Sequence, residues 1–307
     1  MLFRQLEYFV AVARERHFAR AAESCYVSQP ALSAAIAKLE RELNVTLINR
    51  GHNYQGLTPE GERLVVWAKR ILAEQEAFKA EVAAVQSGIT GILRLGTDPT
   101  ASTTLALPVA AFCSAHPLAK VQVRSRLSTK ELHRQLRDFE LDVAIAHFDP
   151  GDQEGLQVVP LYQERYMLLV PDGQIASQTG SVTWADAAQL PLALLTPDMR
   201  IRQIVDKVFA DQGFEVTPQV ETDSIAALYA HVGGGEWASI VPHTWLRAMP
   251  VVGRARALPL VSPAAGAQVS VAIHAGTPGS VAARAFVSAA TALNLDEIFD
   301  QPRTPAR

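Results

Sequence analysis

The chain has 307 residues, of which 49% are hydrophobic and 19% are charged, and its formal net charge is −3. This length suggests roughly two domains of about 150 residues each, and the composition is typical of a globular protein with a large core. No apolar run reaches the ~18 residues of a membrane span, and the start "MLFRQLEYF" lacks the apolar stretch of a signal peptide. Two cysteines are too few for a disulfide framework. These features exclude membrane and secreted classes and predict a cytoplasmic protein without a membrane partner.

Charge is distributed unevenly along the chain. Residues 1–70 hold ten lysines and arginines against seven acidic residues, so this segment carries +3 and the remainder carries −6. A basic module joined to an acidic body indicates a polyanionic partner at one end of the protein only.

Residues 1–58 predict three short helices followed by a β-hairpin. The stretch "HFARAAESC" is typical of a short second helix. Ser28 offers a hydroxyl that can cap the third helix, and Pro30 falls in the first turn, where its missing N–H costs nothing. Two extended pieces around residues 51–56 predict the hairpin, and "TPEGE" begins another helix.

The third helix has two unlike faces. Leu32, Ile36 and Leu39 form an apolar stripe at helical spacing. The opposite face is small, polar and flat, whereas a solvated helix face usually carries long charged side chains. A short helix, a tight turn and a flat-faced helix are typical of a helix-turn-helix, whose second helix enters the major groove of DNA. From this pattern alone, an ordinary helical bundle stays open as the alternative.

The flat face supplies the candidate DNA contacts. Glutamine can pair bidentately with adenine, and serine can bond to either kind of base pair. The predicted base-reading residues are Gln29, Pro30, Ser33 and Ala34. The predicted phosphate contacts, which fix register without reading sequence, are Tyr26, Ser28, Lys38, Arg41, Arg50 and Thr58. The hairpin that follows would form a wing.

Residues 59–89 predict one long helix, on the order of 40 Å in length. Apolar side chains recur along it at alternating spacings of four and three residues, which is a heptad pattern. We interpret this helix as a linker that pairs two subunits, and packing against its own domain is the alternative. The predicted dimerisation residues are Leu64, Ala68, Ile71, Phe78, Val82 and Val85.

Residues 90–300 alternate between strand-like and helical patterns. The strand-like runs lie at 93–96, 121–125, 143–147, 166–170, 193–195, 238–242 and 269–273. Helical patterns between most of them predict an α/β domain with mixed sheets. The tail, residues 301–307, is predicted to be disordered.

The sequence carries no signature of an enzyme. It lacks a G-x-S-x-G motif, an H-E-x-x-H motif and a P-loop, and its eight histidines show no metal-ligand spacing. We therefore predict no catalytic activity, no metal and no cofactor. A second class, a cytoplasmic solute-binding protein without gene control, is disfavoured by the helix-turn-helix and by the missing signal peptide.

Several stretches together resemble the LysR-type transcriptional regulators. They are "HFARAAESCYVSQPALS", "LTPEGE", "GILRLG", "ELDVAIAH" and "VGGGEWASIVP", spread over nearly the whole chain. The resemblance implies a winged helix-turn-helix at 1–58, a dimerising linker helix at 59–89 and an effector-binding domain at 90–300. That domain would resemble periplasmic binding proteins, with lobe 1 at 90–162 and 268–300 and lobe 2 at 163–267. It further implies homodimers or homotetramers on an interrupted palindromic operator, with RNA polymerase as a further partner.

Three segments that are rich in hydroxyl residues, at 97–104, 127–132 and 194–202, match the places where the family holds small effectors. Helix N-termini attract anions through free N–H groups, although helix capping is the simpler explanation of each segment. Arg200 could hold a carboxylate, so a small organic anion is the predicted effector. The predicted effector contacts are Thr97, Thr100, Ser102, Ser128, Thr129, His147, Thr196, Arg200, Arg202, Asp223 and Ser224. Ala34 and Trp237 depart from the family pattern.

The DNA-binding end most resembles the oxidative-stress branch of the family. Peroxide sensors of that branch use a cysteine pair in the second lobe, and the corresponding positions here are Arg200 and Phe209, which cannot form a disulfide. The resemblance therefore does not extend to the peroxide-sensing mechanism. Cys25, near the turn before the third helix, is the remaining candidate for redox control, and a buried inert thiol is the alternative.

Overall fold

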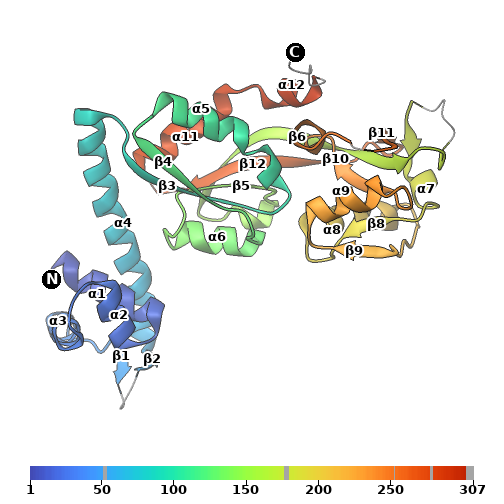
Figure 1. The fold of residues 1–307 in the computed structure, drawn as a ribbon. Coiled ribbons are helices and arrows are strands. Elements are labelled where there is room, and N and C mark those ends of the chain that lie inside the picture. Colours follow the sequence, from blue (N-terminus) through green and yellow to red (C-terminus); the bar gives the residue numbers. More distant parts are fainter. Residues whose placement is uncertain (51–53, 176–179, 252, 277–278, 302–307) are drawn as a thin grey trace. The chain divides into compact units, whose positions relative to one another are not determined.

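The computed structural model describes residues 1–50, 54–175, 180–251, 253–276 and 279–301, except for the side chain of Arg50. The chain divides into two compact units (Figure 1). The first comprises Met1–Thr90 with two short later segments, and the second comprises most of the chain from Gly91 onward. The predicted disordered tail falls outside the described residues apart from Gln301.

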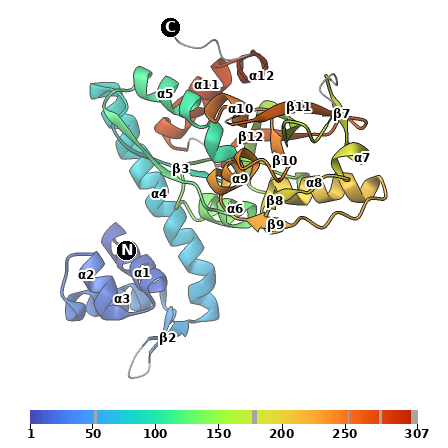
Figure 2. The ribbon, with the colours of Figure 1, turned by 45° about the vertical axis from the view of Figure 1, so that its right-hand side comes forward.

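The first unit is a bundle of helices with a hairpin. Its elements are α1 (Phe3–Glu15), α2 (Phe18–Ser24), α3 (Gln29–Leu43), β1 (Ile48–Arg50), β2 (Tyr54–Leu57) and α4 (Pro59–Ser87). Strands β1 and β2 pair in antiparallel fashion, as predicted for a wing. Leu32, Ile36 and Leu39 are all 0% exposed, so the apolar stripe of α3 faces the core formed with α1 and α2. Figure 2 shows α4 leaving this bundle as one continuous helix.

The start of α4 packs closely against the segment just before β1. Thr58 caps the helix by accepting a hydrogen bond from Gly61 N at 2.9 Å, and its hydroxyl donates to the carbonyl of Thr46 at 2.6 Å. A Cβ atom on Gly61 would overlap the backbone oxygen of Leu47. Glycine at position 61 therefore lets the helix approach the wing, which accounts for the "TPEGE" sequence.

The second unit is an α/β domain. Its first elements are β3 (Gly91–Thr97), a 3₁₀ turn (Ala101–Thr104), α5 (Ala106–Ala115), β4 (Ala119–Arg124), α6 (Thr129–Arg137), β5 (Val143–Ala146) and β6 (Leu156–Pro171). There follow β7 (Val182–Thr183), α7 (Trp184–Ala187), β8 (Ala193–Leu195), α8 (Arg200–Asp211), β9 (Val220–Thr222) and α9 (Ile225–Gly233). The last are β10 (Ser239–Pro242), α10 (Trp245–Ala248), β11 (Ala255–Val261), β12 (Gly266–His274), α11 (Val281–Ala292) and α12 (Leu295–Asp300).

One long strand, β6, connects two regions of this domain. Its first part pairs with β12, from Leu156 to Arg165, and its second part pairs with β10 and β11. The main sheet has the order β4-β3-β5-β12-β6-β11-β7, with β10 also paired to β6, and it contains parallel and antiparallel pairs. The predicted mixed α/β fold is confirmed, although the first part of β6 and the strands β7, β9 and β11 were not predicted.

Among the residues that the structure describes, the hydrophobic cores of this domain include one around α6 and one around the later part of β6. The first core gathers around Leu132, Leu136 and Leu141 with Ala272 of β12. The second core contains Tyr166 and the later part of β6, together with side chains of α8, α9 and β10 and with Trp245. Within the residues that the structure describes, no helix is long and apolar enough to cross a membrane.

Replacing Gly61 with alanine should destabilise the first unit by about 1–3 kcal/mol, because the added methyl group meets backbone rather than a movable side chain. Thermal unfolding of the purified protein measures the effect. Gly151→Ala is the control, because nothing lies within 4 Å of a Cβ at that position. Equal melting temperatures for both variants and wild type would contradict the packing described here.

Candidate functional site

Helix α3 presents its flat face to solvent. Ser28 caps the helix by accepting a hydrogen bond from Ala31 N at 3.4 Å, and Pro30 occupies the first turn. The exposed side chains on this helix include Gln29, Pro30, Ala34, Lys38 and Arg41, and Ser33 is half-buried. The structure therefore brings the predicted base-reading residues together on one surface, with two cations farther along the same helix.

The turn before α3 and the wing after it are both held in place. Tyr26 has a φ of 55° and is 96% exposed, so the turn projects the tyrosine ring into solvent. Glu40, on α3, accepts hydrogen bonds from Leu47 N at 2.9 Å and Ile48 N at 3.2 Å. This carboxylate fixes the start of the wing relative to α3. Sequence reasoning missed Glu40, because a glutamate in a helix gives no sign of its distant backbone partners.

Two of the predicted phosphate contacts, Thr58 and Arg50, lie outside the exposed face of α3. Thr58 is only 7% exposed, and both hydrogen-bonding functions of its hydroxyl are engaged in capping α4. We correct the prediction for Thr58, because this hydroxyl is not available to a phosphate. The side chain of Arg50 lies outside the described residues.

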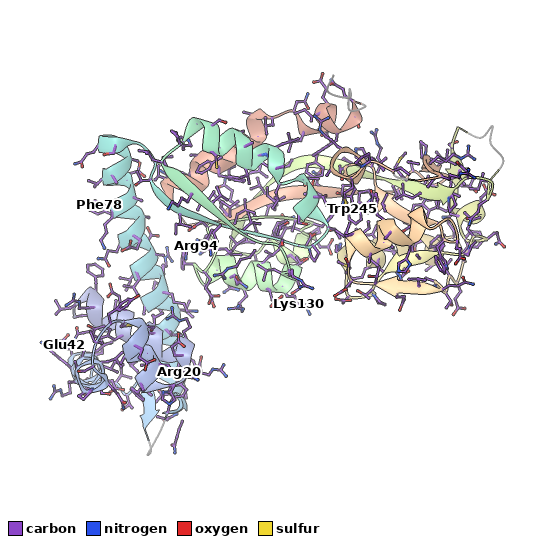
Figure 3. All side chains as sticks on the ribbon, in the orientation of Figure 1. Arg20, Glu42, Phe78, Arg94, Lys130 and Trp245 are labelled. Carbon is purple, nitrogen blue, oxygen red and sulfur yellow. The ribbon has the colours of Figure 1, made fainter. Side chains whose placement is uncertain are left out.

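The predicted dimerisation residues of α4, which we name the α4 seam, fall into two groups. Ala68 is 2% exposed, and Leu64 and Ile71 pack with it against the core of the first unit. For these three residues the alternative, packing on their own domain, is correct. The seam continues with exposed side chains, at 70% for Phe78, which Figure 3 labels, 44% for Val82 and 84% for Val85. Trp67, exposed at 59%, adds an apolar side chain that the heptad pattern did not include.

In the second unit, the end of β3 meets the end of β5 in a buried ionic cluster. Asp98 Oδ1 accepts hydrogen bonds from Thr100 N and Ala101 N, both at 2.8 Å. Asp98 Oδ2 lies 3.3 Å from His147 Nδ1, and His147 Nε2 lies 3.0 Å from Glu164 Oε2. His147 is 3% exposed with both ring nitrogens engaged, so we correct its prediction as an effector contact. Thr97 and Thr100 are corrected for the same reason, because both hydroxyls are buried and donate to Asp98, that of Thr97 to the carbonyl oxygen and that of Thr100 to Oδ1.

The two carboxylates keep His147 charged. Burial disfavours the imidazolium, but hydrogen bonds and charges from Asp98 and Glu164 outweigh this effect and raise the pKa of His147 to about 10. Burial likewise opposes ionisation of Asp98, yet His147 and the loop donors hold the pKa of Asp98 below its usual value. The cluster is thus two carboxylates bridged by one imidazolium.

The guanidinium of Arg202 is bonded to groups within the domain. Its Nη1 donates to Leu195 O and to Glu221 Oε1, each at 2.7 Å, and its Nε donates to Asp206 Oδ1 at 2.7 Å. Two carboxylates therefore neutralise the guanidinium, and we correct its prediction as an anion contact.

The start of α8 has unsatisfied donors. Arg200 Nη2 bonds to Asp149 Oδ1 at 2.6 Å, whereas Arg200 Nε is buried without a partner among the described residues. Thr196 Oγ1 and Tyr166 OH are also buried without a partner among the described residues. Burial and the charge of Glu164 raise the pKa of Tyr166, and the charge of Arg200 opposes that rise. Tyr166 was not predicted, because a tyrosine in a strand is ordinary core.

The remaining predicted effector hydroxyls are mostly used locally. Ser128 forms a capping box with Glu131, and Ser224 caps α9 by accepting from Ala227 N at 3.3 Å. Ser102 Oγ donates to Pro99 O at 2.6 Å. For Ser128 and Ser224 the structure favours the capping explanation, whereas Ser102 bonds to the backbone of its own turn. Thr129 begins α6, and Asp223 lies 3.7 Å from the Arg126 guanidinium on the surface.

The two cysteines are free and belong to different units. Cys25 follows α2 and packs, half-buried, against the core of the first unit, with its Sγ 4.0 Å from Ser24 Oγ. Cys113 lies in α5. Among the described residues, no group of three histidine, cysteine or acidic side chains is arranged to hold a metal ion.

A winged helix-turn-helix, a long helix and an α/β domain are the architecture of a class of DNA-binding transcriptional regulators. Residues 3–62 match the model of the bacterial regulatory helix-turn-helix proteins of the lysR family, and residues 86–294 match that of the LysR substrate binding domain. The chain belongs to the LysR family of DNA-binding transcriptional regulators.

Similar proteins with known names are themselves regulators. A probable hydrogen peroxide-inducible genes activator of Streptomyces viridosporus is 31% identical over 275 residues, covering 89% of this chain and 88% of that protein. A probable RuBisCO transcriptional regulator of Porphyra purpurea is 32% identical over 244 residues, covering 77% and 76%. These relatives confirm the predicted family and leave the signal undefined.

Solved structures agree over nearly the full length. A full-length OxyR variant from Pseudomonas aeruginosa superposes with a TM-score of 0.75 at 26% identity, covering 95% of this chain and 98% of that one. Full-length CbnR in complex with its target DNA superposes with a TM-score of 0.61 at 25% identity, covering 94% and 99%. The alternative of a solute-binding protein without gene control is therefore rejected.

His147 should remain an imidazolium at neutral pH and lose its proton only near pH 10. Its folded pKa lies above the unfolded value of about 6.5. Its contribution to stability is therefore complete below about pH 6.5 and declines as pH rises toward 10. Nitrogen-15 NMR of the histidine rings follows the titration. A neutral His147 at pH 7 would contradict the ionic cluster.

Proposed function

We propose that this regulator reads an interrupted palindromic operator with paired α3 helices and changes its DNA-bound arrangement when a small organic anion binds the second unit. The observation that carries the proposal is the flat, exposed face of α3, from Gln29 to Arg41, above a fully buried apolar stripe. The protein would act in the cytoplasm as a homodimer or homotetramer. RNA polymerase as a partner and redox control through Cys25 stay predictions.

The proposed division of labour on α3 separates specificity from affinity. Gln29 stands in the first turn, where a recognition helix reaches base edges, and its amide can form two bonds to one adenine. Lys38 stands farther along the helix and can contact phosphate only as a point charge. Ser28, Tyr26 and Arg41 flank this surface and are proposed to fix its register on the backbone.

Gln29→Ala should remove about 1–3 kcal/mol of discrimination at one base position, whereas Lys38→Ala should weaken binding to all DNA alike. The lysine variant should also flatten the salt dependence by about one unit. Titrations on operator and scrambled DNA at several salt concentrations separate the two effects. Equal losses on both DNAs for Gln29→Ala would remove its proposed reading role.

The proposed dimer contact is the exposed part of the α4 seam. Phe78, Val82 and Val85 lie on one side of the helix and remain exposed in a single chain. An apolar stripe of this kind on an isolated helix is stabilised when a second copy covers it. The proposal omits Leu64, Ala68 and Ile71, which are used within the first unit.

Phe78→Glu should dissociate the dimer, because burying an unpaired charge in the seam is costly. Light scattering measures the mass, and DNA affinity should fall as the two half-site contacts uncouple. Ser87→Glu adds the same charge to an exposed position on the opposite side of α4 and should leave the mass unchanged. An unchanged mass for both variants would refute this assignment.

The proposed effector site is the start of α8. Arg200 Nε, Thr196 Oγ1 and Tyr166 OH are three buried donors without partners among the described residues. Unsatisfied buried donors are costly, and an anion that accepts from them would remove that cost. Asp149 already binds the outer nitrogen of Arg200, and it is 57% exposed, so a ligand carboxylate can compete with it.

Arg200→Ala should abolish stabilisation by the anion while leaving basal DNA binding intact. A thermal-shift screen with acetate, succinate and benzoate on both proteins measures this. Lys207→Ala removes another cation from α8, one that pairs with Asp211 on the surface, and should respond as wild type does. Equal stabilisation of the Arg200 variant and wild type by the same acids would place the site elsewhere.

A further inference from the structure

The ionic cluster of Asp98, His147 and Glu164 belongs to a ring of hydrogen bonds that is closed by the peptide bond between Thr244 and Trp245. Glu164 Oε1 accepts from Thr244 Oγ1 at 3.1 Å. The next residue, Trp245, donates its indole N–H to Thr100 O at 3.0 Å. Thr100 in turn donates its backbone N–H to Asp98, at the other end of the cluster. We name this arrangement the Asp98 ring, and its members are Asp98, Thr100, His147, Glu164, Thr244 and Trp245.

The Asp98 ring joins the loop after β3 to the second core. Asp98 and Thr100 follow β3, whereas Trp245 belongs to the second core and is 0% exposed. Thr244 is 1% exposed and Glu164, on β6, is 0% exposed. Trp245, labelled in Figure 3, therefore bonds from the second core to a carbonyl in the loop after β3.

Because its members are buried, the Asp98 ring restricts the position of residues 98–104. A buried hydrogen bond is stronger than one in water, and a buried polar group that loses its partner is costly. Residues 98–104 cannot shift as a unit without breaking the bond between Asp98 and His147 or the bond of Trp245 to Thr100. The loop position and the position of Thr244 and Trp245 are therefore coupled.

Ser239 provides a contrast in the same region. Its hydroxyl, on β10, is fully buried and has no partner among the described residues. A buried hydroxyl in this region can therefore lack a hydrogen-bond partner among the described residues. The hydroxyl of Thr244, which follows shortly after the end of β10, is instead bonded to the charged cluster.

We propose that Thr244 and Trp245 are positioning residues that hold residues 98–104 in place through the Asp98 ring. Tyr166, a donor of the proposed effector site, belongs to the same second core as Trp245, so this regulatory role rests on the proposed function. The ring thereby links occupancy of that site, through the second core, to the position of residues 98–104.

Hydrogen–deuterium exchange of the full-length protein tests the proposal without any effector. In Trp245→Phe, which keeps an aromatic ring but lacks the N–H, peptides covering residues 98–104 should exchange about 3- to 10-fold faster. Thr244→Val should accelerate the same peptides, and Thr244→Ser should restore the wild-type rate because it keeps the hydroxyl. Ser239→Ala is the matched control and should leave these peptides unchanged.

The proposal is overturned if Thr244→Val and Trp245→Phe leave exchange at 98–104 at the wild-type rate, or if Thr244→Ser behaves like Thr244→Val. It is also overturned if Ser239→Ala accelerates these peptides as much, because general loosening of the second core would then explain the effect. Should Trp245→Phe fail to fold, Thr244→Val and Thr244→Ser still decide. The acid screen on Arg200→Ala tests the effector site separately, so the two failures are distinguishable.

Discussion

Two carboxylates, Asp98 and Glu164, are buried on either side of one imidazole, and the arrangement of the effector-binding domain depends on keeping all three together. Removing one partner of a buried ion pair leaves an uncompensated charge, which typically costs about 3–5 kcal/mol. The cluster can form only where the ends of β3 and β5 meet the middle of β6. It therefore fixes the loop after β3.

The DNA-binding unit rests on a different constraint, the separation of two faces on α3. The buried face is closed by α1 and α2, and this leaves a surface of small and polar side chains that can approach base edges. Glu40 and Gly61 then set the position of the wing and of α4 relative to that helix. A similar division applies to α4, whose first turns complete the domain core and whose later turns expose the apolar side chains proposed for pairing.

The sequence predicted the elements of the DNA-binding unit closely, because periodicity and capping residues act locally. It could not tell which part of the α4 heptad pattern faces the same domain, since Leu64 and Phe78 look alike in a repeat. It missed the first part of β6, because Pro160 interrupts the strand pattern there. A shift in the register between β6 and β12 lies opposite, between Val269 and Ser270.

The candidate effector site was harder to predict. Arg200 and Thr196 were predicted from their place after a strand and stay a proposal. Arg202 was assigned on charge alone, and only the structure shows Glu221 and Asp206 neutralising it. Glu164 and Thr244 gave no signal at all, because their partners come from 17 and 80 residues away in the chain. Long-range pairing of this kind is invisible to local patterns.

The most direct test of the account is selection of DNA by the full-length protein from a pool of random double-stranded sequences. Paired recognition helices predict an enriched motif with two inverted half-sites, separated by about one helical turn of DNA or a multiple of it. Enrichment that is independent of sequence, or of a single half-site without a partner, would contradict the central claim that two α3 helices read an operator together.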